Sequence, residues 1–74
     1  MDTGMGYLLC VLPSRIGLER DIATADAERL GIHSCGDSIN GSPIFKLLTR
    51  EGFMITYLEA GGELRYSRTD RLHE

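Results

Sequence analysis

The sequence lacks tryptophan and holds only two cysteines and two prolines in 74 residues. Cys10 and Cys35 are too few for the disulfide framework that stabilises many small secreted domains. The longest apolar run, residues 7–12, is far shorter than the roughly 20 residues of a membrane-spanning helix. No basic residue precedes this run, so we expect no secretory signal. These absences predict a soluble cytoplasmic protein that does not contact a membrane and keeps both thiols unpaired.

Basic residues are in the minority. Eight Lys and Arg face eleven Asp and Glu, for a net charge of −3, and this balance argues against a general binder of nucleic acid. The charge is uneven, because residues 1–41 carry −3 and residues 42–74 carry none. With 42% hydrophobic and 26% charged residues, the composition is that of a folded domain. The length fits a single domain over residues 1–74, with frayed ends at 1–6 and 70–74.

The motifs of common catalytic and cofactor sites are also missing. The sequence has no phosphate-binding glycine loop and no nucleophile elbow. Residues 33–38 place His33, Cys35, Asp37 and Ser38 close together, but catalytic groups usually converge from separate elements. We interpret this segment as a structural turn, and we predict that the protein is not an enzyme and binds no cofactor.

The spacing of possible metal ligands also argues against a metal site. A zinc site would have to combine His33 and Cys35 with His73 and Cys10, which gives one close pair where structural zinc sites use two. A calcium loop that starts at Asp37 would reach its twelfth position without the required glutamate. The sequence therefore predicts no metal site.

Local signals predict a strand and then a long helix. The apolar run at 7–12 is typical of a buried strand, which Pro13 ends. Ser14 is a good N-cap for a helix over residues 15–30, and Gly31 is a good residue to end it. The apolar stripe of this helix consists of Ile22, Ala23, Ala27 and Leu30.

A second helix is predicted over residues 42–52, after a short strand at 32–35 and a loop at 36–41. Ser42 and Pro43 are favourable residues for the N-cap and the first helical position. The spacing of Ile44, Leu47 and Leu48 matches one face of a helix.

The remaining residues, 53–68, predict a β-hairpin around Gly61-Gly62, a pair that accepts positive φ. This turn sets Ala60 opposite Glu63, Leu58 opposite Arg65, Tyr57 opposite Tyr66, and Ile55 opposite Arg68. One face of the hairpin then carries its core residues, Phe53, Ile55, Tyr57, Leu64 and Tyr66. The whole chain is thus predicted to be an α+β domain, a three-stranded antiparallel sheet covered by two helices and ending in the hairpin.

Residues 24–32 look like the first helix of a helix-turn-helix, residues 45–53 like the end of a recognition helix, and residues 54–68 like a wing. This pattern resembles small winged-helix transcriptional regulators. The resemblance implies sequence-specific DNA binding. The residues that it would bring to DNA are Lys46, Thr49, Arg50, Arg65 and Arg68.

Our leading hypothesis is a non-enzymatic protein-binding module. A small acidic domain without catalytic groups works by contact, through an acidic helix face or through the edge of a hairpin. The partner would present a basic surface, and a phage or mobile-element inhibitor of a host nucleic-acid-binding or defence protein fits this description. Edge pairing would also let the chain form a homodimer. The acidic residues assigned to the partner contact are Glu19, Asp21, Asp26 and Glu28.

Overall fold

The structure, a computed structural model, describes residues 15–72. The strand predicted at 7–12, the end at 1–6, Cys10 and His73 lie outside these residues.

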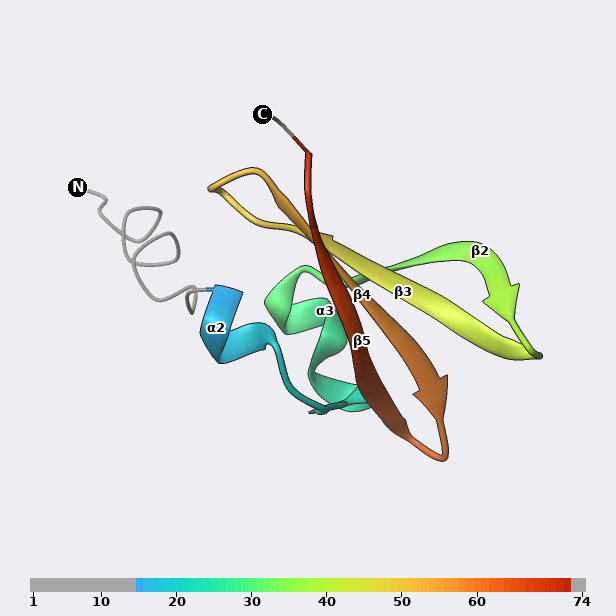
Figure 1. Cartoon of the computed structure of the whole chain (residues 1–74). Helices are drawn as coiled ribbons and strands as arrows, with labels where there is room; N and C mark the ends of the chain where they lie inside the picture. Colours follow the sequence, from blue (N-terminus) through green and yellow to red (C-terminus); the bar gives the residue numbers. More distant parts are fainter. Residues whose placement is uncertain (1–14, 73–74) are drawn as a thin grey trace.

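One antiparallel sheet dominates the described residues (Figure 1). Its five strands lie in the order β1-β5-β4-β3-β2, so that β2 to β5 form a meander and β1 pairs with β5. The predicted three-stranded sheet with two helices is therefore wrong. The strands are β1 (Ile22–Ala23), β2 (His33–Ile39), β3 (Ser42–Leu48), β4 (Phe53–Ala60) and β5 (Glu63–Arg71).

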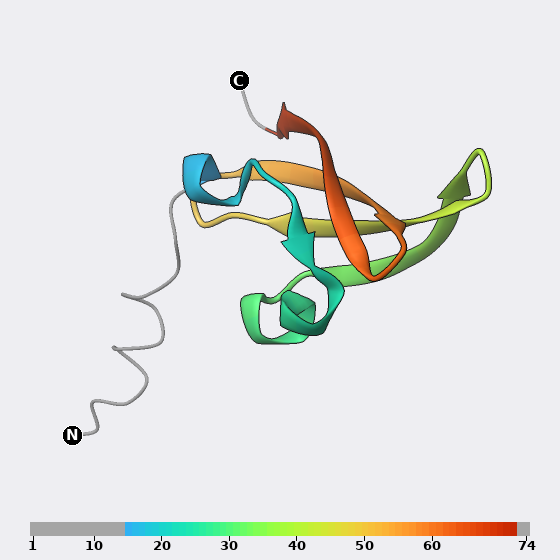
Figure 2. The same cartoon turned by 90° about the horizontal axis from the view of Figure 1, so that it is seen from below.

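The helix predicted over residues 15–30 is divided into short pieces. These are α2 (Arg15–Leu18), the 3-10 turn η1 (Thr24–Asp26) and α3 (Ala27–Leu30). The division has a tertiary cause, because β1 pairs with β5 through Ile22 opposite Leu64. The chain then passes from β1 at one sheet edge to β2 at the other, and η1 and α3 lie on this path (Figures 1 and 2).

The predicted end of this helix is confirmed. Gly31 adopts the left-handed conformation, with φ of 82°. Its N–H donates to the carbonyl of Glu28, and the N–H of Ile32 donates to that of Ala27. This is the hydrogen-bond pattern of a Schellman cap, and Ile32 and Ala27 are both buried beside it.

The second predicted helix, over residues 42–52, is wrong. Residues 42–48 form β3, and a turn at 49–52 leads into β4. Asn40 and Gly41 join β2 to β3 with φ of 51° and 85°, which is the geometry of a two-residue type I′ turn. The segment that resembled a recognition helix is thus a strand and a turn, and the winged-helix architecture is absent from residues 15–72.

The predicted β4–β5 hairpin is confirmed as far as its middle. Gly61-Gly62 is the turn, and Tyr57 lies opposite Tyr66 as expected. Beyond that pair the predicted register is wrong, since Ile55 lies opposite Thr69 and not Arg68. An unpaired residue, Ser67, forms a β-bulge there and shifts the rest of β5 by one position.

The hydrophobic core lies on one side of the sheet, which we call the core face. Ile55, Tyr57 and Leu64 are fully buried there, as the alternation in the hairpin predicts. Leu18 of α2 and Ala27 of α3 pack against them. The short helices therefore cover this face of the sheet.

The opposite side of the sheet, which we call the open face, is the side on which these helices do not pack. Paired residues share a face, so the register assigns its members. Figure 2 shows the sheet with both helices toward one end and the β2–β3 turn at the other. The open face of β3, β4 and β5 carries Ile44, Lys46, Leu48, Met54, Thr56, Leu58, Ala60, Glu63, Arg65, Arg68 and Asp70.

Candidate functional site

The acidic residues predicted to contact a partner do not lie on one helix, because the predicted helix is divided. Glu19 follows α2, and its carboxylate pairs with the Arg15 guanidinium at 3.2 Å. Asp21 precedes β1, and its Oδ1 accepts a hydrogen bond of 2.9 Å from the backbone N–H of Tyr66. The Glu19 pair is thus local to α2, whereas the Asp21 contact joins the residue before β1 to β5.

The other two acidic residues lie in the connection that leads to β2. Asp26 ends η1 and pairs with Arg29 at 3.2 Å. Glu28 of α3 is exposed and lines a hollow of about 430 Å³ beside the turn at 49–52. The role of the four acidic residues in partner binding stays a prediction.

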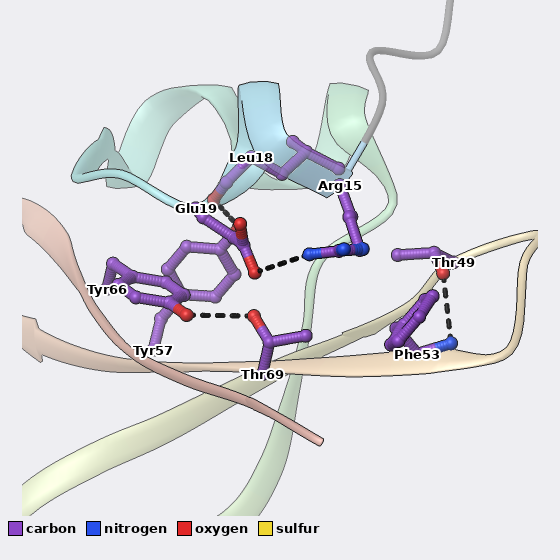
Figure 3. A network of polar contacts seen from close by, with 8 residues as sticks. All are labelled: Arg15, Leu18, Glu19, Thr49, Phe53, Tyr57, Tyr66 and Thr69. Atoms are coloured by element: carbon purple, nitrogen blue, oxygen red, sulfur yellow. Dashed lines mark hydrogen bonds and ion pairs between the residues drawn. The ribbon is translucent and has the colours of Figure 1, made fainter. Parts of the chain in front are cut away.

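The hollow beside α3 also contains two residues from the predicted DNA-binding set, Thr49 and Arg50. Thr49 has a structural task as well, since its Oγ1 accepts a hydrogen bond of 3.0 Å from the N–H of Phe53 (Figure 3). These two residues are therefore on the turn, away from the three basic residues on the strands. Four leucines make much of the lining apolar, namely Leu18, Leu30, Leu47 and Leu48.

The other three residues of the DNA-binding set lie together on the open face. Lys46 of β3 and Arg68 of β5 lie on opposite sides of Thr56 in the same row across the sheet. Arg65 lies in the next row of that face, opposite Leu58. Regular alternation would place Arg65 and Arg68 on different faces, and the bulge at Ser67 brings them to the same one.

The segment at 33–38 is not the predicted turn, because residues 33–39 form β2. His33 lies opposite Lys46, and the Cys35 thiol donates to the carbonyl of Ile44 at 3.4 Å. Within residues 15–72, no three His, Cys, Asp or Glu side chains are grouped as metal ligands would be.

Strand β2 is the most exposed strand of the sheet. All seven of its residues are exposed, and it pairs only with β3. Ile39 and Ser42 close the type I′ turn as a hydrogen-bonded pair, so the next pair, Ser38 and Pro43, is of the non-hydrogen-bonded kind. The backbone N–H and C=O of Ser38 therefore point away from β3, toward the free edge. The same alternation explains how β3 accepts Pro43, whose missing N–H is not needed by β2.

The β2–β3 turn and the bulge at Ser67, which shape the β2 edge and the open face, were not predicted from the sequence. Asn40-Gly41 is a strong hairpin signal on its own, and it would have identified the exposed β2–β3 hairpin. The bulge at Ser67 has no comparable local signal, because its position follows from the register of the whole β4–β5 pair.

Comparison with protein-family models, with curated proteins and with solved structures finds no match to this chain. Within residues 15–72, no helix is long and apolar enough to cross a membrane.

Proposed function

We propose that this chain is a non-enzymatic protein-binding module that adds an extended segment of a partner protein to the free edge of β2. One observation carries the proposal: β2 is a seven-residue edge strand, exposed throughout, whose Ser38 backbone groups face outward. The pairing of β2 with β3 is irregular between Ser34 and Ser38, so the regular part of the edge is the part beside the turn, at Ser38 and Ile39. The unpaired backbone groups of such an edge provide donors and acceptors for a partner strand.

The other side of the sheet is protected against strand addition. β1 covers the edge of β5 for only two residues, but the Asp21 carboxylate occupies the N–H of Tyr66 just beyond it. The uncovered part of β5 then carries Arg68, Asp70 and Arg71, and charged side chains on an edge disfavour pairing. β2 has Asp37 as its only formally charged residue. The β2 edge therefore carries fewer charges than the β5 edge, and beyond its irregularity at 34–38 the part beside the turn is open to a partner strand.

The expected location of the protein and the expected kind of partner are inferred from composition. A cytoplasmic location and a role as a phage or mobile-element inhibitor stay predictions, as does a partner with a basic surface. A second copy of this chain is also a partner that the β2 edge would accept, in an antiparallel pair.

The experiment replaces one backbone donor. Ser38→Pro removes the outward N–H of β2 while keeping every hydrogen bond to β3, and Ser38→Ala is the matched control that keeps the donor. A photo-reactive residue at Asp37 is used to trap the partner in extracts of cells that carry the gene, and the same residue at the exposed Glu63 of β5 serves as the position control.

We expect a crosslinked species from position 37 and none from position 63. The Ser38→Pro background should lose it and the Ser38→Ala background should retain it, while amide NMR spectra show that both variants are folded. A product at twice the mass of the chain would identify the partner as a second copy. Equal crosslinking in the proline and alanine backgrounds would rule out strand addition at β2.

A further inference from the structure

The open face has an apolar strip where β3 and β4 run side by side. Ile44 lies opposite Leu58, and Leu48 lies opposite Met54. Ile44 is 8% exposed, whereas Leu48 is 57% exposed, so the strip is accessible mainly at the Leu48 end. A solvated sheet face normally carries polar residues at these positions, and a strip of this kind is typical of a contact surface.

Basic side chains border this strip on two strands. Lys46 interrupts it on β3, and Arg65 and Arg68 flank it on β5. With strands about 4.8 Å apart, the backbones of Lys46 and Arg68 are separated by roughly 10 Å. Between them lies Thr56, in a hollow of about 130 Å³ that Lys46 and Arg68 help to line.

In the part of the chain that the structure describes, only one of the three basic side chains on this face has an acidic partner. Arg68 pairs with Asp70 at 3.0 Å. Lys46 and Arg65 are both exposed, and among residues 15–72 neither has an ion-pair partner. The open face of β3, β4 and β5 thus carries three basic residues against two acidic ones, Glu63 and Asp70, which leaves a local excess of positive charge in an acidic chain. The complementary ligand combines carboxylates with apolar side chains.

We propose that the open face binds an acidic amphipathic segment of a partner protein. Apolar side chains of that segment lie on the strip formed by Ile44, Leu48, Met54 and Leu58. Its carboxylates reach Lys46, which lies within the strip on β3, and Arg65 and Arg68, which flank the strip on β5. This surface is distinct from the β2 edge, so the proposal does not depend on strand addition.

The same observations favour a peptide over a nucleic acid. Single-stranded nucleic acids bind to basic surfaces on which bases stack against aromatic rings. Of the residues that the structure describes, the Phe and Tyr side chains all lie on the core face by register, and none borders Lys46, Arg65 or Arg68. The β4 residues opposite these three basic residues on the open face are Thr56 and the aliphatic Leu58.

The test selects peptides from a displayed random library on the immobilised full chain. We expect enriched peptides that combine Asp or Glu with Leu, Ile or Phe. Their affinity should fall at least tenfold for the double variant Lys46→Glu, Arg68→Glu, which is equivalent to about 1.4 kcal/mol or more. The matched control, Arg20→Glu with Arg29→Glu, makes the same change in net charge on exposed residues outside the strands and should change affinity less than twofold.

Two further measurements make the result decisive. Ser38→Pro should leave peptide affinity unchanged, which separates this surface from the β2 edge. The proposal is wrong if no peptide is enriched, if enriched peptides lack an acidic excess, or if the two charge-reversal variants bind equally. It is also overturned if mixed-sequence single-stranded or duplex DNA binds more tightly than the best peptide at equal salt and loses its binding in the Lys46→Glu, Arg68→Glu variant.

Discussion

The hydroxyl of Tyr57 donates a hydrogen bond of 2.6 Å to the backbone carbonyl of Leu18, across 39 residues of sequence (Figure 3). Both residues are buried, and the contact joins α2 to the central strand β4. A helix of four residues cannot satisfy its own C-terminal carbonyls. The bond to Tyr57 therefore supplies a partner that α2 cannot provide, and it fixes this helix on the core face.

Tyr57→Phe should destabilise the fold by about 1–3 kcal/mol, because the buried Leu18 carbonyl loses its donor while the ring still fills its site. Urea denaturation followed by circular dichroism measures the change. Tyr66→Phe is the comparison, since the Tyr66 hydroxyl bonds to Thr69 Oγ1 at 2.9 Å in a less buried place. A Tyr57→Phe effect no larger than that of Tyr66→Phe would contradict the structural role assigned to this bond.

The same tyrosine predicts a dependence of stability on alkaline pH. Burial raises the pKa of Tyr57 from 10.0 to about 12, and the nearby Arg20 opposes this shift. Between these values the unfolded chain has lost the phenol proton while the folded chain keeps it. The contribution of the protonated Tyr57 to the unfolding free energy is therefore complete below pH 10 and is lost as the pH rises toward 12. The loss is roughly 3 kcal/mol at most.

This prediction is measured by urea denaturation of wild type and Tyr57→Phe across that pH range. The difference in unfolding free energy between the two proteins should shrink as the pH rises, because groups other than Tyr57 titrate in both. A constant difference from pH 9 upward would show that Tyr57 ionises normally.

The parts of the fold that sequence predicts well depend on short-range chemistry. The Gly61-Gly62 turn needs positive φ at both residues, and it sets the nearby β4–β5 pairs directly. The cap at Gly31 depends on neighbouring residues in the same way. Both features were predictable because the residues that determine them lie within a few positions of each other.

The errors arise where tertiary pairing overrides a local preference. Ser42 and Pro43 favour a helix start, and Ile44, Leu47 and Leu48 fit helical spacing, yet this segment pairs with β2 and β4. In the strand, Ile44 and Leu48 lie on the open face while Leu47 lies on the core face. Because both faces accept apolar residues here, the pattern fits either structure, and only the neighbouring strands decide between them.

The basic residues on the open face were identified individually, but their arrangement was not predictable. Their common face depends on the bulge at Ser67, which is a property of the paired strands. The interpretation of the acidic residues had the opposite weakness. Their charge was evident, whereas the bond from Tyr66 to Asp21 follows from a contact 45 residues away.

Asp21→Ala should lower the unfolding free energy by up to about 1 kcal/mol, because the N–H of Tyr66 loses its acceptor at the uncovered edge of β5. Glu28→Ala removes a carboxylate of the same predicted set, on an exposed residue, and should change stability by no more than a few tenths of a kcal/mol. Hydrogen exchange at the Tyr66 amide gives the local readout, and it should accelerate only in the Asp21 variant. Equal stability of the two variants would argue against a structural role for Asp21.

Gly41→Ala should weaken the β2–β3 hairpin, because Gly41 has φ of 85°, which residues with a side chain rarely adopt. Nothing lies within 4 Å of an added Cβ, so no steric clash contributes. The cost is therefore conformational, about 1–2 kcal/mol. Asn40→Gly is the matched change, because it leaves both turn residues able to adopt positive φ. It should change the unfolding free energy by no more than a few tenths of a kcal/mol. Amide exchange should accelerate in β2 after Gly41→Ala and stay slow at Ile55 and Tyr57, and uniform acceleration would show that the hairpin is not a separate unit.

The bulge provides the sharpest test of the register. Deleting Ser67 should leave the sheet intact, since Tyr66 and the residue after the deletion would then lie opposite Tyr57 and Thr56 in regular alternation. Deleting Thr69 instead should move Asp70 to the core face, opposite Ile55, because a shift of one residue moves every following side chain to the other face. The site of Thr69 is half-buried, and a carboxylate partly removed from water beside Ile55 is unfavourable. This variant should therefore be less stable than the Ser67 deletion by about 1–3 kcal/mol. Thermal unfolding of the two deletions is the measurement, and a Ser67 deletion as damaging as the Thr69 deletion would mean that the bulge is required for the fold itself.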